Sequence, residues 1–207
     1  MDEFFEYFIE TVGEPCAYIE VPSFAYTKYK GILPDALLSY WEEYGWSPFA
    51  NGLIWLTNPE DYEDIVQEWL GEISEFKGLK WYVFARTAFG SMYAFQPESA
   101  QIIDILCAKG TIVGSKEEVM PINKELQIQT FFSSCKKRTF DLEDDHGNSL
   151  FDQAFEKFGA LEANEVYGFQ PFLVLGGKES IENIQKVRLD VHLDIMRQFT
   201  DLQLYLI

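Results

Sequence analysis

Apolar residues recur every three or four positions in several stretches of the chain, a spacing that is typical of amphipathic helices. In the first of these stretches, Phe5 and Phe8 would face inward. Two helix starts carry additional signals. Pro34 suits a first helical turn, and Asn58 followed by Pro59 places a capping side chain ahead of acidic residues. Helices are therefore predicted over residues 2–12, 32–44, 58–70, 126–135 and 150–158.

Shorter apolar runs, bounded by turn residues, predict β-strands between these helices. The segment Arg86–Gly90 would join two of them, and Ala108–Gly110 would form a hairpin-like turn between two others. Consecutive strands joined by short turns pair side by side, so the sequence predicts an antiparallel meander. Its strands are expected at residues 50–56, 79–84, 91–95, 102–107 and 111–113.

The last fifth of the chain has a pattern of its own. The apolar run Val166–Leu175 ends at the double glycine Gly176-Gly177, and a charged, amphipathic segment continues to Phe199. This order predicts a buried strand, a tight turn and a helix. Both glycines are then structural, because glycine permits a positive φ or a close backbone approach.

Together these elements indicate an α+β fold, in which an antiparallel sheet has flanking helices. A boundary near residues 110–125 would divide the chain into residues 1–115 and 116–207, with a connector over residues 115–124. No stretch rich in proline, glycine or serine separates the two parts. We therefore expect them to pack tightly against each other.

Composition adds two expectations. Aromatic residues make up 16% of the chain, with 18 Phe, 11 Tyr and 5 Trp, which predicts an aromatic core or, alternatively, an exposed aromatic binding surface. The 34 acidic residues outnumber the 16 basic ones, for a net charge of −18. Such a field repels nucleic acids and anionic membranes and favours a cationic partner, although acidity alone also serves solubility.

The cysteine pattern and the N-terminus point to the cytoplasm. Cys16, Cys107 and Cys135 are odd in number and widely spaced, which fits buried thiols in a reducing compartment better than a disulfide framework. The acidic, aromatic N-terminus lacks the features of a signal peptide, and no apolar run reaches membrane-spanning length. We expect a cytoplasmic protein that does not contact membranes.

No pattern in the chain predicts a catalytic residue, a metal ligand or a cofactor. The chain has two histidines. His192 falls in the middle of the predicted last helix and is interpreted as a structural group. His146 falls in a polar segment, and neither histidine has a nearby serine or cysteine with which to form a nucleophile pair.

The most polar stretch, Lys136–Asn148, is predicted to be an exposed loop. Its acidic spacing is similar to a calcium loop, but His146 stands where such a loop needs glycine. A solvated loop and an acidic patch for a cationic partner remain as interpretations. In the second case the partner-binding residues are Asp141, Glu143, Asp144 and Asp145.

Two stretches resemble a known family. Tyr167-Gly168-Phe169-x-Pro171-x-Leu173-x-Leu175-Gly176-Gly177, followed by Ile181-Glu182-Asn183-Ile184-x-Lys186-Val187 and Val191-His192-Leu193, resembles the C-terminal domain of type VI secretion DNase immunity proteins of the Tdi type. Leu33-Pro34, Trp41-x-x-Tyr44-Gly45, Asn51-Gly52-Leu53-Ile54-Trp55 and Asn58-Pro59 resemble the GAD-like domain that precedes it in those proteins. The division above would then separate a GAD-like domain, residues 1–115, from a Tdi-type domain, residues 116–207.

The resemblance implies a cytoplasmic immunity protein that neutralises a cognate, basic nuclease effector by occlusion and does not itself bind nucleic acid. It marks six residues as a structural family motif: Gly176, Gly177, Glu182, Asn183, Lys186 and His192. It identifies no residue of the toxin interface. Two other classes stay open from the residues alone: a carboxylate-pair hydrolase and a general partner-binding adaptor.

Overall fold

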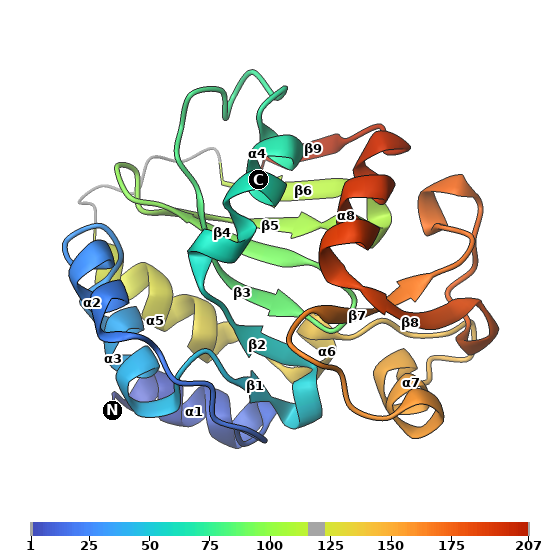
Figure 1. Cartoon of the computed structure of the whole chain (residues 1–207), viewed down its shortest axis with the longest axis horizontal. Coiled ribbons are helices and arrows are strands. Elements are labelled where there is room, and N and C mark those ends of the chain that lie inside the picture. Colours follow the sequence, from blue (N-terminus) through green and yellow to red (C-terminus); the bar gives the residue numbers. More distant parts are fainter. Residues whose placement is uncertain (1, 116–122, 207) are drawn as a thin grey trace.

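A seven-stranded sheet forms the centre of the molecule (Figure 1). The computed structural model describes residues 2–115 and 123–206. In spatial order the strands are β1 (Pro48–Phe49), β2 (Ile54–Leu56), β3 (Tyr82–Thr87), β4 (Met92–Gln96), β5 (Gln101–Leu106), β6 (Thr111–Gly114) and β9 (Gln203–Leu206). The first six pair antiparallel, whereas β9 pairs parallel with β6. The predicted antiparallel sheet with flanking helices is confirmed, and the end of the chain adds a strand to it.

The remaining elements are helices and one separate hairpin. The hairpin consists of β7 (Glu165–Phe169) and β8 (Ile184–Arg188). The helices are α1 (Glu3–Val12), α2 (Ser23–Tyr29), α3 (Asp35–Tyr44), α4 (Glu63–Leu70), α5 (Lys124–Ser134), α6 (Lys137–Phe140), α7 (Leu150–Phe158) and α8 (Leu189–Gln198). Short 3-10 turns occupy Ala50–Gly52, Pro59–Tyr62, Cys107–Lys109, Leu173–Leu175 and Ile181–Asn183.

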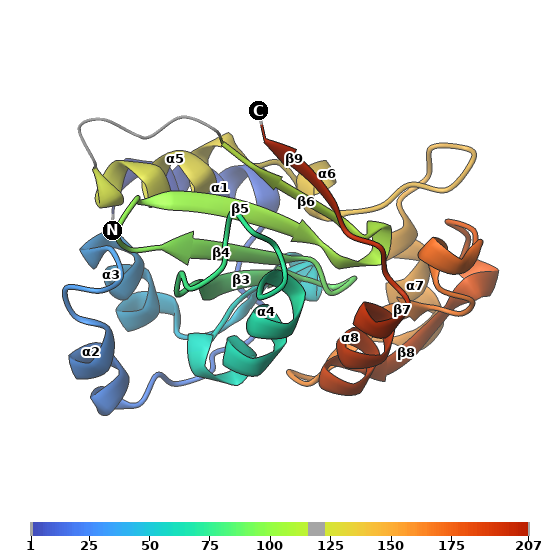
Figure 2. The same cartoon turned by 90° about the horizontal axis from the view of Figure 1, so that it is seen from above.

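Both faces of the sheet are buried. Side chains alternate along a strand, and in β4 Tyr93 and Phe95 join one apolar cluster while Met92 and Ala94 join the other. The first cluster includes α1, α3 and α5, and the second includes α4 and α8. Figure 2 shows α5 and α4 on opposite sides of the sheet. The fold therefore has three layers, with helices from both halves of the chain covering the sheet.

The first cluster is strongly aromatic, as the composition predicts. The Phe5 ring stacks on Tyr40 with centroids 4.0 Å apart and meets Phe132 edge-on at 4.9 Å. These rings come from α1, α3 and α5, so the aromatic contacts join the first half of the chain to the second. Among the aromatics that remain outside the core, Tyr18 and Phe199 are clearly exposed.

Polar contacts also link the two halves tightly. The Glu125 carboxylate in α5 accepts hydrogen bonds from the backbone N–H groups of Asp35 (2.9 Å) and Ala36 (2.7 Å), at the N-terminus of α3. A carboxylate there satisfies otherwise unpaired donors and meets the positive end of the helix dipole. In β3, the buried Arg86 guanidinium lies over the Trp55 ring at 4.4 Å and donates to the Ala163 carbonyl at 3.0 Å.

The predicted helices form with small shifts at their ends. The helix expected from residue 32 begins at Asp35, because Pro34 occupies the cap position rather than the first turn. Asn58 caps the next segment by accepting a hydrogen bond from Glu60 N–H. The division at residue 115 stays a prediction, and most of the expected connector, residues 116–122, lies outside the described residues.

Several local predictions were wrong. The strand expected at residues 79–84 is displaced to Tyr82–Thr87, so Arg86 and Thr87 belong to β3 and not to the turn that follows it. Residues 50–52 form a turn rather than a strand, because Ala50 and Asn51 adopt positive φ angles of 51° and 60°. The segment 136–148 is not wholly a loop, since it contains α6, whose Phe140 is buried in the aromatic cluster. Most importantly, the double glycine does not lead directly into the last helix.

Residues 184–188 after the double glycine pair with β7 as β8, and α8 begins only at Leu189. The preceding apolar run also ends as a strand at Phe169, where Gln170 and Pro171 follow. Proline lacks the N–H that a strand ladder needs, so the backbone turns away from the hairpin. The correct order is strand, turn, strand and helix.

Gly176 and Gly177 are both structural, for different reasons. Gly176 has φ +88° and ψ 14°, and an added Cβ would meet no atom within 4 Å. Gly177 does not have the positive φ that could have explained it. Instead, an added Cβ would lie 2.1 Å from the Pro171 carbonyl oxygen, because the two backbone segments approach closely.

We predict that Gly177→Ala destabilises the fold by about 1–3 kcal/mol, because the backbone at Pro171 must move to admit the Cβ. Gly176→Asn is the matched control, since asparagine tolerates the left-handed region and the space around Gly176 is open. Denaturant unfolding of both variants measures the difference. Equal stabilities for the two variants would contradict the close-approach explanation.

Asp104 in β5 lies opposite Tyr93 of β4. It lies on the face of β5 that carries the aromatic cluster, and its side chain has no hydrogen-bond partner among the described residues. Burial raises the pKa of Asp104 from 3.8 to about 6. A raised carboxyl pKa means that stability is fully present below about pH 4 and is lost as the pH rises through 6.

Asp104→Asn should therefore stabilise the protein at pH 7 by about 1–3 kcal/mol, since one pKa unit corresponds to about 1.4 kcal/mol. The gain over the unmodified protein should shrink toward zero as the pH falls to about 4. Urea unfolding across this range tests the prediction, with the exposed Glu10→Gln in α1 as control. A gain that is the same at pH 4 and pH 7 would show that the charge is not its cause.

Candidate functional site

The four acidic residues of the predicted partner-binding loop fall into two pairs. Asp141 accepts hydrogen bonds from the Leu142 N–H (2.7 Å), the Phe151 N–H (3.0 Å) and the Ser149 hydroxyl (2.5 Å). Burial outweighs these bonds and raises the pKa of Asp141. This carboxylate fixes the entry into α7 and is not available as a free charge.

Asp144 organises the tip of the same loop. It accepts hydrogen bonds from the backbone N–H groups of His146 and Asn148, both at 2.9 Å, and from the Gln153 amide at 3.1 Å. The bonds from Asn148 are the main cause that lowers the pKa of Asp144 to about 2. Of the four acidic residues, Glu143 and Asp145 are the exposed ones, so they are the carboxylates of this loop that solvent reaches most fully.

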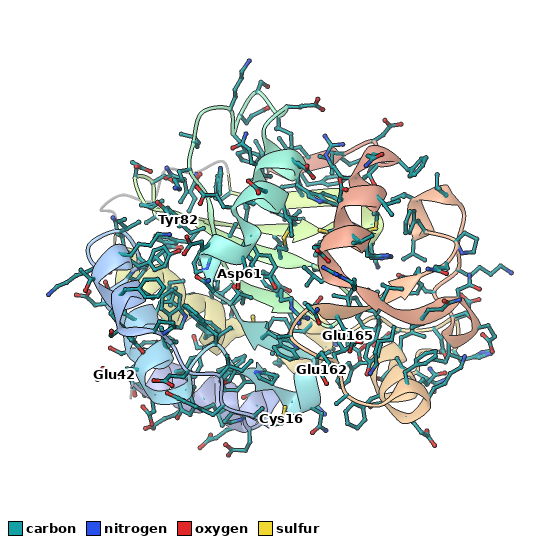
Figure 3. All side chains as sticks on the ribbon, in the orientation of Figure 1. Cys16, Glu42, Asp61, Tyr82, Glu162 and Glu165 are labelled. Atoms are coloured by element: carbon teal, nitrogen blue, oxygen red, sulfur yellow. The ribbon has the colours of Figure 1, made fainter. Side chains whose placement is uncertain are left out.

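Three of the six motif residues, Glu182, Asn183 and Lys186, lie in β8 and the turn before it. Lys186 donates to the Ala160 carbonyl at 2.6 Å and lies 3.6 Å from the Glu165 carboxylate. Glu165 also accepts a hydrogen bond from Glu162 N–H at 2.8 Å, and Figure 3 shows these two glutamates side by side. The Asn183 carbonyl accepts from Gln170 N–H at 2.7 Å, and the exposed Glu182 accepts from a nearby serine. The structural role of the motif stays a prediction, and these contacts lie within the protein.

The sixth motif residue, His192, lies at an apolar groove of about 420 Å³. The groove runs between α8 and the segment that follows β7, and the rest of its lining is almost entirely apolar. Its main side chains are Phe172, Leu175, Val187, Val191, His192 and Ile195. The sequence did not reveal this groove, because its lining comes from two segments that are separated along the chain, residues 169–175 and 187–195.

His192 contributes the buried polar group of this groove. Its side chain is 7% exposed, lies edge-on to Phe172 at 5.2 Å, and has no hydrogen-bond partner among the described residues. Burial lowers the pKa of His192 to about 4, so the imidazole is neutral at physiological pH and carries one donor and one acceptor nitrogen. Gly168 in β7 makes room for the ring, since an added Cβ would lie 2.5 Å from its Cε1 atom.

The outer surface of α8 continues the apolar character of the groove. Val191, Ile195 and Phe199 are 47%, 41% and 55% exposed, and they succeed one another at intervals of four residues along one side of the helix. The Phe199 ring lies 6.5 Å from Phe172, so this stripe is continuous with the groove lining. The i, i+4, i+8 spacing is the sequence signal that could have revealed it.

A second groove, of about 590 Å³, lies on the other side of α8, against α4. It is lined by the acidic residues Glu68, Glu72 and Asp194 and by one cation, Arg197. The Arg197 guanidinium is engaged within the protein: it lies 3.1 Å from the Glu72 carboxylate and donates to the Glu68 carbonyl at 3.0 Å. The carboxylates of Glu68 and Asp194 are left without a cationic partner among the described residues.

The cysteines offer no activated nucleophile. Cys107 and Cys135 are buried, as expected, but Cys16 is exposed, contrary to the prediction of buried thiols. Burial raises the pKa of all three thiols, so each stays protonated and is a poor nucleophile at neutral pH. Within residues 2–115 and 123–206, no three or more His, Cys, Asp or Glu side chains are grouped to hold a metal ion. Across the same residues, no helix has the length and apolar character needed to cross a membrane.

Comparisons with known proteins bear on both halves of the chain. The GAD-like domain family matches residues 3–109, and the family "T6SS immunity protein Tdi1, C-terminal" matches residues 125–200. No curated protein matches the chain. The crystal structure of Atu4351 from Agrobacterium tumefaciens shares the fold, with a TM-score of 0.86 over 97% of this chain and 91% of that chain, at 21% identity.

The two family matches follow one another with a short interval, in the order that the resemblance predicts. The first alone spans more than half of the chain. The six motif residues, including the groove histidine, all lie within the second. The chain thus belongs to the GAD-like family, and its residues 125–200 match the C-terminal domain of the type VI secretion immunity protein Tdi1, which supports an immunity role.

Proposed function

We propose that this immunity protein binds a cognate nuclease effector, a DNase, in the cytoplasm and neutralises it by occluding the surface that contacts DNA. The observation that carries the proposal is the match of residues 125–200 to the Tdi1 immunity family. The protein would act by occupying a surface, so it needs a rigid fold and an exposed docking face but no reactive group.

The charge of the chain supports a nuclease as the target. A protein that cuts DNA must attract a polyanion, so we expect its DNA-binding face to be basic. An inhibitor with a net charge of −18 competes for that face and is drawn to it by long-range attraction. The same charge disfavours direct binding of this protein to nucleic acid.

The structure gives little support to the alternative of a carboxylate-pair hydrolase. Such an enzyme needs two carboxylates facing each other across a cleft. The carboxylate whose pKa is clearly raised into the range of a general acid, Asp104, lies in β5 opposite Tyr93 of β4, and burial alone accounts for that shift. The general adaptor alternative lacks the specific support that the immunity family provides.

We predict that the purified protein forms a stable complex with the toxin domain of the effector encoded beside its gene, and that co-expression restores growth of cells that produce this toxin. The association rate should fall as sodium chloride rises from 50 to 500 mM, since exposed charges are screened beyond about 10 Å at 0.1 M. Stopped-flow or surface plasmon resonance measurements give this rate. Absence of binding at micromolar concentrations would disprove the proposal.

We further propose that the acidic loop contributes to this attraction through its two exposed acids. Glu143→Gln combined with Asp145→Asn should slow association with the toxin about two- to fivefold at low salt and leave the melting temperature unchanged. The matched pair Asp141→Asn and Asp144→Asn should instead lower the melting temperature, because both carboxylates accept several hydrogen bonds. If the first pair of substitutions leaves the rate unchanged, the loop lies outside the interface.

A further inference from the structure

The helix α8 separates two surfaces of opposite character. On one side is the apolar groove with His192, and on the other is the acidic groove shared with α4. Figure 1 shows α8 at the surface, between α4 and the segment that follows β7. A partner that lies across this helix would contact both grooves at once.

The apolar groove requires an occupant with a particular chemistry. Its volume of about 420 Å³ lies in the range of about 300–1,000 Å³ that is typical of ligand pockets. Its lining is apolar apart from the exposed Gln170 and Arg188 at its edge and the buried His192. Arg188 is paired with Asp190, whereas the His192 side chain is more than nine-tenths buried and has no hydrogen-bond partner among the described residues. A buried polar group without a partner costs free energy, so the best occupant has an apolar body and a hydrogen-bonding tip. Among protein side chains, tyrosine and tryptophan meet this description.

The acidic groove requires positive charge. The carboxylates of Glu68 and Asp194 are exposed, and the one cation in the groove, Arg197, already serves Glu72. Asp190 lies one turn before Asp194, but it is paired with Arg188 at 2.6 Å. Lysine or arginine side chains of a partner would find two carboxylates here without a competing internal cation.

We propose that the two grooves beside α8 are the docking surface for the toxin, and that the toxin segment bound there is amphipathic, with a tyrosine or tryptophan in the apolar groove and basic side chains against Glu68 and Asp194. This assignment rests on the proposed function and adds to it the surface and the chemistry of the partner. The apolar stripe Val191, Ile195 and Phe199 supplies the area that excludes water around the anchor.

Charge decides against a second copy of this chain as the occupant. A two-fold dimer through this face would bring the acidic patches of both subunits into one interface, where their like charges repel each other. Each subunit also carries a net charge of −18. With a basic partner, the local contact of the acidic groove and the long-range interaction of the net charges both become attractive. The toxin is therefore the favoured occupant.

Three changes test the surface, and each is measured as the dissociation constant for the nuclease-inactivated toxin domain at 150 mM salt. Ile195→Glu places a charge on the exposed stripe and should weaken binding at least about thirtyfold. Glu68→Lys combined with Asp194→Lys should weaken it about tenfold, mainly through slower association. His192→Phe keeps an aromatic ring at this position but removes the two ring nitrogens, and should weaken binding about tenfold.

Matched controls separate docking from general effects. Leu126→Glu makes the same apolar-to-acidic change at an exposed residue of α5, on the opposite side of the sheet. Glu6→Lys combined with Glu10→Lys makes the same charge change on α1. Both controls should bind the toxin within about threefold of the unmodified protein, because neither lies beside α8. Melting temperatures confirm that every variant is folded, and Ile195→Glu keeps the test decisive even if His192→Phe does not fold.

The outcomes distinguish the surface from the function. If the unmodified protein binds the toxin tightly and the three α8 variants bind it equally well, this assignment is wrong while the proposed function stands. If the unmodified protein does not bind the toxin, both fail. Two further results would overturn the assignment in favour of another occupant: a dimer in sedimentation that Ile195→Glu dissociates, or a small molecule retained by the native protein and lost in that variant.

Discussion

Burial of the central sheet on both faces is the constraint on which the rest of the structure depends. Strands β3, β4 and β5 place bulky side chains on each face in alternation, so neither face can be left to solvent. The first half of the chain supplies α1, α3 and α4, and the second half supplies α5 and α8 to complete the two layers. The two matched regions of the chain therefore contribute side chains to the same two hydrophobic clusters.

This arrangement fixes which surfaces remain for function. Leu189, Leu193 and Met196 turn one side of α8 toward the sheet, and the opposite side is left with an apolar stripe and acidic neighbours. The segment over residues 170–177 follows β7 and lies beside this helix. Lys186 fixes the hairpin through its bond to the Ala160 carbonyl, and the close approach of Gly177 to Pro171 fixes the segment. The groove at His192 is thus preorganised, which reduces the entropy lost when a partner binds.

An inhibitor that works by occupying a surface gains most from rigidity and charge. The buried titratable groups fit such a role, because burial keeps His192 neutral and the cysteine thiols protonated at physiological pH. In the proposed complex, the exposed carboxylates would provide the long-range attraction, and the apolar groove would provide an anchor that salt does not screen. The association rate and the dissociation rate would then depend on different residues of the same surface.

The sequence by itself determined the α+β class, most helix positions, the acidic character and the family motif, because these depend on local spacing, caps and composition. The cap at Asn58 depends only on the residues next to it in the sequence, and α7 forms at the predicted residues 150–158. Only the tertiary structure decided that residues 184–188 form a strand, that β9 joins β6 and that Asp141 and Asp144 bind their own loop. The groove at His192 likewise depends on partners that are distant in sequence, and a local pattern of hydrophobic and polar residues does not specify such partners.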